Sequence, residues 1–146
     1  MKKLALAFFI ALNTLNAGIV IAPDSLPVNI KQFIKDYFNA EIGLVEQDGY
    51  SYEIYLSDGS EIEFSLNGEF KEAENFKSLN YAILPLAIQN TIKNIYPNTA
   101  IIEIERKISY YKIKLNNQIK LYIDDNGTIL RQKLTIKCLF DFAQIS

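Results

Sequence analysis

The sequence contains no histidine and only one cysteine, Cys138. The first absence excludes histidine-based catalytic triads, histidine general bases and the usual zinc ligand sets. A single cysteine cannot form an intrachain disulfide, and we interpret Cys138 as a small buried hydrophobic residue. The chain also lacks a Walker-type or dinucleotide-binding glycine motif. Its net charge of −2 provides no overall attraction to nucleic acid.

Long hydrophobic runs are also missing. The longest one near the N-terminus, "LALAFFIAL", follows Lys2 and Lys3 and is much shorter than the ~20 residues that cross a bilayer. This pattern predicts a signal peptide over residues 1–17, cleaved after Ala17, with a site after Ala22 as the alternative. We therefore expect a periplasmic or secreted protein that is not inserted in a membrane after cleavage.

The chain does contain a sequence pattern that occurs twice. "LPVNIKQFIKDYFN" at 26–39 resembles "LPLAIQNTIKNIYPN" at 84–98, and "YEIYL" at 52–56 resembles "YKIKL" at 111–115. In each half the apolar residues first recur at helical spacing, after an early proline, and then alternate with polar residues as in half-buried strands. The pattern predicts an α+β fold, a tandem repeat of helix plus antiparallel β-meander, with the helices packed on one face of the antiparallel sheet.

Turn residues support this interpretation. "SDGS" at 57–60 and "NG" at 67–68 and 126–127 supply the positive-φ positions of tight hairpins, whereas "LNNQIK" at 115–120 has no such glycine. We predict repeats over about 26–75 and 84–131, with 73–83 as their connection. Residues 132–146 form a C-terminal extension of the same 18–146 domain.

The helix endings "YFNAEI" and "YPNTAI", together with "YEIYLSDGSEIEFSLNGEF", resemble the PepSY-like proteins, exported bacterial domains grouped with the beta-lactamase inhibitory proteins. The resemblance covers 26 to about 131. It implies helices on one face of a sheet whose other face holds a partner, and it implies no catalytic residues. Related domains in protease propeptides are thought to restrain or regulate peptidases.

Charge is distributed unevenly along the chain. Residues 41–75 contain ten acidic residues and one lysine, whereas residues 100–137 contain four acidic and eight basic residues. Alternation places many of these charges, together with tyrosines, on the sheet face away from the core. Tyrosine is enriched at protein interfaces, so we predict a partner-binding face there. Its residues are Tyr55, Tyr110, Tyr122, Glu53, Glu61, Glu63, Lys112, Lys114 and Lys120.

Two other interpretations of these residues remain. Exposed strands are normally polar, and cross-strand glutamate–lysine pairs can simply satisfy one another. Alternatively, a hollow between sheet and helices, lined by Tyr52, Phe64 and Tyr111, holds a small ligand.

Catalysis and metal binding fit the sequence poorly. Glu61 and Glu63 lie on an open face without the burial that paired catalytic carboxylates need. "YIDDNGTILRQK" at 122–133 lacks ligands at the first and last positions of a calcium loop. We therefore predict a non-enzymatic binding, inhibitory or regulatory module without cofactor or metal. Its partner would be another envelope protein, such as a peptidase or other enzyme.

Overall fold

A computed structural model describes residues 18–135 as one antiparallel sheet of nine strands, which neighbour one another in chain order. The first half contains β1 (Ile19–Val20), β2 (Ile42–Gln47), β3 (Ser51–Leu56), β4 (Glu61–Ser65) and β5 (Phe70–Glu74). The second half contains β6 (Ile101–Arg106), β7 (Tyr111–Leu115), β8 (Ile119–Ile123) and β9 (Ile129–Leu134). The predicted signal peptide, Cys138 and most of the predicted C-terminal extension lie outside the described residues.

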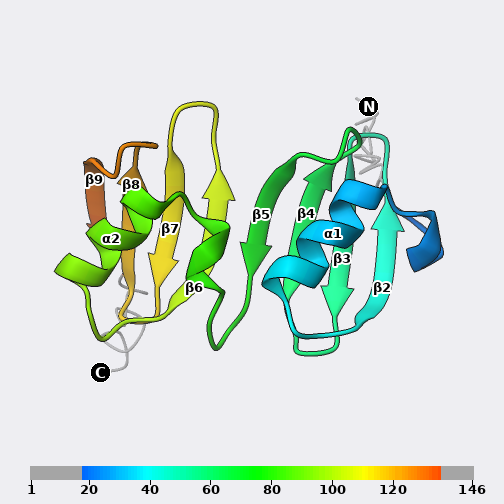
Figure 1. The fold of residues 1–146 in the computed structure, drawn as a ribbon, viewed down its shortest axis with the longest axis horizontal. Helices are drawn as coiled ribbons and strands as arrows, with labels where there is room; N and C mark the ends of the chain where they lie inside the picture. Colours follow the sequence, from blue (N-terminus) through cyan, green and yellow to red (C-terminus); the bar gives the residue numbers. More distant parts are fainter. Residues whose placement is uncertain (1–17, 136–146) are drawn as a thin grey trace, which may run out of the picture.

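Two α-helices lie on one side of this sheet, α1 (Val28–Tyr37) before β2 and α2 (Leu86–Ile95) before β6 (Figure 1). Each follows a proline N-cap, Pro27 or Pro85, and a single 3₁₀ turn, η1 (Pro23–Ser25) or η2 (Tyr81–Ile83). Proline suits this position because the first N–H groups of a helix have no intrahelical partner. Within residues 18–135, neither helix is long and apolar enough to span a membrane.

The α+β class and the helices on one face agree with the structure, but the predicted tandem repeat of helix-plus-meander units is wrong. The structure is a single sheet, because β5 pairs with β6 and joins the two halves. The segment expected to begin the connection contributes Ala73 and Glu74 to β5. Ala73 lies opposite Ile104, and both are fully buried, so the sheet and its core continue across the middle of the chain.

The core lies between the sheet and the helices. Ile30 and Ile34 from α1, and Ile88 and Ile92 from α2, pack on inward-facing strand residues. Those strand residues include Ile54, Ile62, Phe64, Ile104, Ile113 and Leu121. Their alternation with polar residues leaves the opposite sheet face to the charged side chains, as expected for a sheet with one covered face.

Tight turns close the hairpins where the sequence predicts them. Gly59, Gly68 and Gly127 all adopt positive φ, in the β3–β4, β4–β5 and β8–β9 turns. The β7–β8 turn lacks glycine, and Gln118 adopts a φ of 71° there. Gly127 also touches α2, because Thr91 Oγ1 donates a hydrogen bond to the Gly127 carbonyl oxygen at 2.8 Å.

We expect Gly127→Ala to lower the free energy of unfolding by about 2 kcal/mol. Gly127 has a φ of +83°, and a Cβ there would lie 2.7 Å from the Ala87 carbonyl oxygen. The control is Gly49→Ala, because a Cβ at Gly49 meets nothing within 4 Å. Urea unfolding followed by circular dichroism measures both, and a loss for Gly49→Ala as large as that for Gly127→Ala would contradict this account.

Candidate functional site

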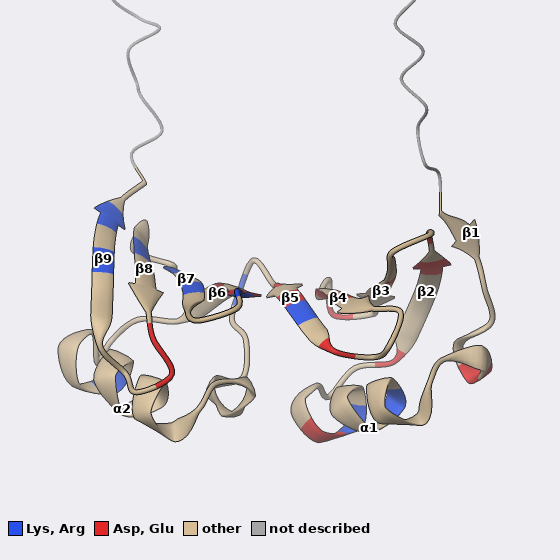
Figure 2. Cartoon of the chain, turned by 90° about the horizontal axis from the view of Figure 1, so that it is seen from above, with Lys and Arg blue, Asp and Glu red and all other residues tan. Residues whose placement is uncertain are grey.

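The predicted partner-binding residues all lie on or beside strands whose inward residues face the helices. Their positions are Glu53 and Tyr55 on β3, Glu61 and Glu63 on β4, Lys112 and Lys114 on β7, Lys120 and Tyr122 on β8, and Tyr110 directly before β7. Both helices lie on the other side of the sheet (Figure 2). Among the described residues, no helix covers this face, which we call the open face.

Strand register arranges the open face into two rows that run across the sheet. The first row is Glu46, Glu53, Glu63, Glu72, Glu105, Lys112, Tyr122 and Arg131. The second is Leu44, Tyr55, Glu61, Glu74, Glu103, Lys114, Lys120 and Lys133. In both rows the charge changes sign between β6 and β7.

The acidic part of the open face contains a hollow of about 190 Å³ over β3, β4 and β5. We call its polar lining the acidic patch, which consists of Glu53, Tyr55, Glu61, Glu63, Glu72 and Glu74. Lys71 forms an ion pair with Glu63. Within residues 18–135, no ion pair involves Glu53, Glu61, Glu72 or Glu74. The acidic patch therefore carries a marked excess of negative charge.

Glutamates face one another directly across neighbouring strands in this region. Glu72 lies opposite Glu63 on one side and Glu105 on the other, and Glu74 lies between Glu61 and Glu103 in the same way. Like charges in directly opposed positions destabilise a sheet. The acidic patch is thus maintained against electrostatic repulsion, by the core on the other side of the same strands.

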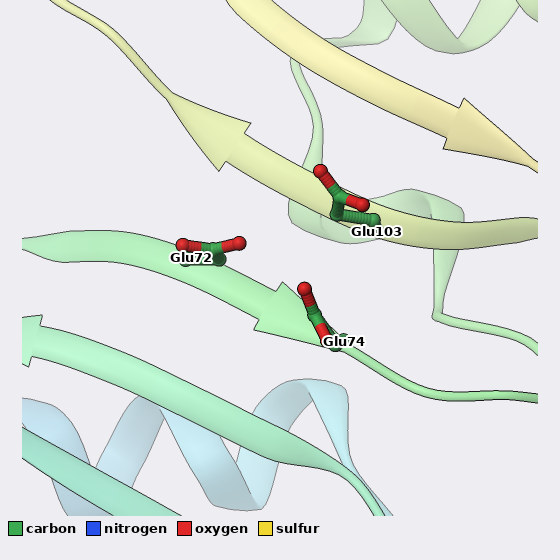
Figure 3. Close-up of side chains that lie close together, drawn as sticks. All are labelled: Glu72, Glu74 and Glu103. Carbon is green, nitrogen blue, oxygen red and sulfur yellow. The ribbon is translucent and has the colours of Figure 1, made fainter. Parts of the chain in front are cut away.

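At Glu72 this repulsion acts together with burial. Burial, and then the nearby carboxylates led by Glu105, raise the pKa of Glu72 to about 7. The carboxylate oxygens of Glu72, Glu74 and Glu103 lie within 4.8 Å of one another, where β5 meets β6 (Figure 3). Because of the raised pKa, Glu72 carries a proton in a large fraction of molecules at neutral pH.

Tyr55 closes one side of the hollow. Its hydroxyl donates a hydrogen bond to Glu53 Oε2 at 2.9 Å. This hydrogen bond is the largest of the effects that raise the pKa of Tyr55 to about 12. The phenol therefore stays protonated at physiological pH and remains a donor to the carboxylate.

The basic part of the open face differs, because Lys112, Lys114 and Lys120 lie near glutamates of β6. Lys107 and Lys112 form ion pairs with Glu105, and Lys120 lies 3.7 Å from Glu103. Burial of Glu105 opposes ionisation, but hydrogen bonds from Lys107 and Lys112 lower the pKa of Glu105 overall. The pairs that Lys112, Lys114 and Lys120 form with glutamates of β6 match the alternative in which opposite charges satisfy one another, and Lys71–Glu63 is a similar pair in the acidic part.

The three predicted tyrosines do not form one cluster. The rings of Tyr110 and Tyr122 lie 6.0 Å apart, and the guanidinium of Arg131 stacks 3.9 Å from the Tyr122 ring centroid. Tyr55 lies on β3, which is four strands away from β7, the strand that follows Tyr110. At the usual strand spacing this is a separation of ~19 Å, and Tyr122 on β8 lies one strand farther away. Tyr55 and the Tyr110–Tyr122 pair thus belong to different ends of the open face.

Several residues of this face were not predicted from the sequence, namely Glu72, Glu74, Glu103, Glu105 and Arg131. The signal was present, because "FKEAE" and "IEIER" both alternate glutamate with other residues. The end of "FKEAE" was predicted to belong to the connection at 73–83. Consequently, β6 was not predicted to lie beside this segment. Without that pairing, the contact between Glu72, Glu74 and Glu103 could not be inferred.

Two groups of residues that the sequence analysis considered, in the rejected calcium loop and in the alternative ligand cavity, have structural roles in the described part of the chain. Asp124 Oδ1 accepts hydrogen bonds from the backbone N–H groups of Asn126 and Thr128, which closes the β8–β9 turn. Phe64 and Tyr111, candidates for lining a ligand cavity, are only 1% and 6% exposed, and Tyr52 packs against the same core. Phe64 contacts the rings of Phe33 and Phe70.

The family model described as "Putative beta-lactamase-inhibitor-like, PepSY-like" matches residues 50–131. The chain belongs to the PepSY-like family. This confirms the resemblance seen in the sequence. A comparison with curated proteins gave no match.

Solved structures of similar proteins come from Bacteroides. One, described as a "putative calcium-regulated periplasmic protein" from Bacteroides thetaiotaomicron, is 31% identical, with a TM-score of 0.72, and the match covers 78% of this chain and 94% of that chain. A protein from Bacteroides vulgatus that is described as a "putative periplasmic protein of unknown function" is 28% identical, with a TM-score of 0.70 and coverage of 79% of this chain and 98% of that chain. A second Bacteroides vulgatus protein, 24% identical over 79% and 95% of the chains with a TM-score of 0.70, shares the fold.

We expect Glu72→Gln to stabilise the protein at pH 8 by about 1 kcal/mol and to have little effect at pH 4. The folded pKa of about 7 exceeds the ordinary value of 4.5. The native state therefore retains a proton that the unfolded chain releases, so this group's contribution to stability falls as pH rises from 4.5 to 7. Urea unfolding at both pH values measures the effect.

The matched control is Glu69→Gln, which removes the same charge from an exposed turn outside the acidic patch. An equal gain at pH 8 for Glu69→Gln would show that overall net charge, rather than the environment of Glu72, sets the stability.

Proposed function

We propose that the protein is an exported, non-enzymatic binding module that holds or inhibits another envelope protein on its open face. The supporting observation is the pair of charged rows, in which a glutamate-rich region and a lysine-rich region share one uncovered sheet surface. Electrostatic complementarity of this kind selects partners and fixes their orientation. Export to the periplasm is part of the proposal and is supported by similar proteins that are described as periplasmic.

A small-ligand carrier has less support. The side chains that would line its cavity between sheet and helices are packed together in the core. The hollow on the open face is instead bordered by five glutamates and Tyr55, over Ile54 and Ile62.

Photo-cross-linking in an envelope extract tests the proposed face. We expect benzoyl-phenylalanine in place of Tyr55 or Tyr122 to give a discrete adduct with a second protein. The same group in place of Val28, which is 77% exposed on helix α1, should not give that adduct. The proposal would be abandoned if Val28 gave the same adduct, or if neither open-face position gave one.

Calcium regulation is a second candidate function, favoured by the similar Bacteroides thetaiotaomicron protein, which is described as calcium-regulated, and by the carboxylates of Glu72, Glu74 and Glu103. Calcium takes 6–8 oxygen ligands at 2.3–2.6 Å, so two ligands on opposite sides of the ion lie up to about 5 Å apart. The three carboxylates satisfy this limit and would need water for the remaining positions. Lys120 near Glu103 competes with the ion, which favours an affinity near the ~10⁻³ M of weak extracellular sites.

We expect millimolar calcium to raise the melting temperature of the wild-type protein and to leave that of Glu74→Gln unchanged, because a ligand that binds only the native state stabilises it. Differential scanning calorimetry measures both, and Glu69→Gln should respond to calcium as the wild type does. An unchanged wild-type melting temperature, or an equal rise in Glu74→Gln, would exclude calcium binding at these carboxylates.

A further inference from the structure

The two ends of the open face are not equivalent as docking surfaces. Between β6 and β7, glutamates lie opposite lysines, as in the pairs Glu105–Lys112 and Glu103–Lys114. On β3, β4 and β5, glutamates lie opposite glutamates. In this second region, most carboxylates form no ion pair with a lysine or arginine of the described residues. A positively charged group that approaches the region therefore forms a favourable contact with them.

We propose that the acidic patch is the docking site for an extended, lysine- or arginine-rich segment of a partner protein, which lies along β4 and β5. This inference rests on the proposed function and names the chemistry of the partner. The basic side chains of the segment form ion pairs with Glu61 and Glu74, and its backbone lies over the hollow beside Tyr55.

Spacing on the strands determines which segment fits. Glu61 and Glu63 are two residues apart on β4, and Glu72 and Glu74 are two residues apart on β5. Side chains on one face of an extended chain repeat every ~6.6–6.8 Å. A segment with basic residues at alternate positions therefore presents one cation to each carboxylate along a strand, whereas a block of consecutive basic residues directs half of them away.

The basic patch of Lys112, Lys114, Lys120, Arg131 and Lys133 limits the orientation of the segment. Like charges repel a cationic chain that runs across the sheet toward β7 and β9. The segment is thereby kept parallel to β4 and within the acidic half of the open face.

Fluorescence anisotropy with synthetic peptides tests this inference on the mature chain. The probes are the labelled peptide KTKTKTKTKT, its block isomer KKKKKTTTTT and the acidic ETETETETET. We expect the alternating basic peptide to bind most tightly, the block isomer to bind about tenfold more weakly, and the acidic peptide not to bind. Binding should weaken as salt increases.

The decisive variant is Glu61→Gln/Glu74→Gln, which we expect to weaken binding of the alternating peptide about tenfold. Its matched control, Glu41→Gln/Glu69→Gln, removes the same net charge from exposed positions outside the acidic patch and should change the affinity less than twofold. The decisive variant removes a like-charge contact, so it should remain folded, which circular dichroism verifies.

Three outcomes overturn the inference: equal weakening in both double variants, equal affinity for the two basic isomers, or no binding of the alternating peptide. The proposed function is tested separately by the adducts at Tyr55 and Tyr122. If those adducts form while any of the three outcomes is found, the open face binds a partner of different chemistry.

Discussion

The pairing of β5 with β6 is the contact on which the rest of the structure depends. It places Ala73 against Ile104 in the core and, on the other side of the same strands, Glu72 against Glu105 and Glu74 against Glu103. The apolar pair stabilises the junction, whereas the glutamate pairs oppose it. The continuous core and the crowded carboxylates are therefore two consequences of one register.

This arrangement is the reason that we propose a function for the open face rather than for a cavity. The inward side chains are close-packed, and the described residues leave no buried side-chain nitrogen or oxygen without a hydrogen-bond partner. The open face instead retains unbalanced charge, a hollow lined by glutamates and protonation of Glu72 near neutral pH. Such departures from local stability are common at binding sites, where selection acts on interaction as well as on folding.

Much of the fold was predictable from local patterns. Period-two alternation in "YEIYL", helical spacing after Pro27 and Pro85, and the glycines of the turns each depend on neighbouring residues only. The β5–β6 pairing was not predictable in this way, because in "FKEAE" only Phe70, at its start, and the small Ala73 pack against the core. Its strand conformation depends on tertiary contact with Ile104. The predicted site residues were placed on one face by alternation, but their division into an acidic patch and an internally paired basic region required the register.

Both Asn-Gly turns contact a helix, and these contacts limit where the chain tolerates an insertion. Asn29 on α1 donates a hydrogen bond to the Gly68 carbonyl oxygen at 3.1 Å, and Thr91 on α2 does the same to Gly127. An insertion at either turn would separate a hairpin from its helix. The β6–β7 turn has a fully exposed tip at Ile108. Additional residues, an affinity tag or a fused domain can therefore be placed at that turn with least disturbance to the fold.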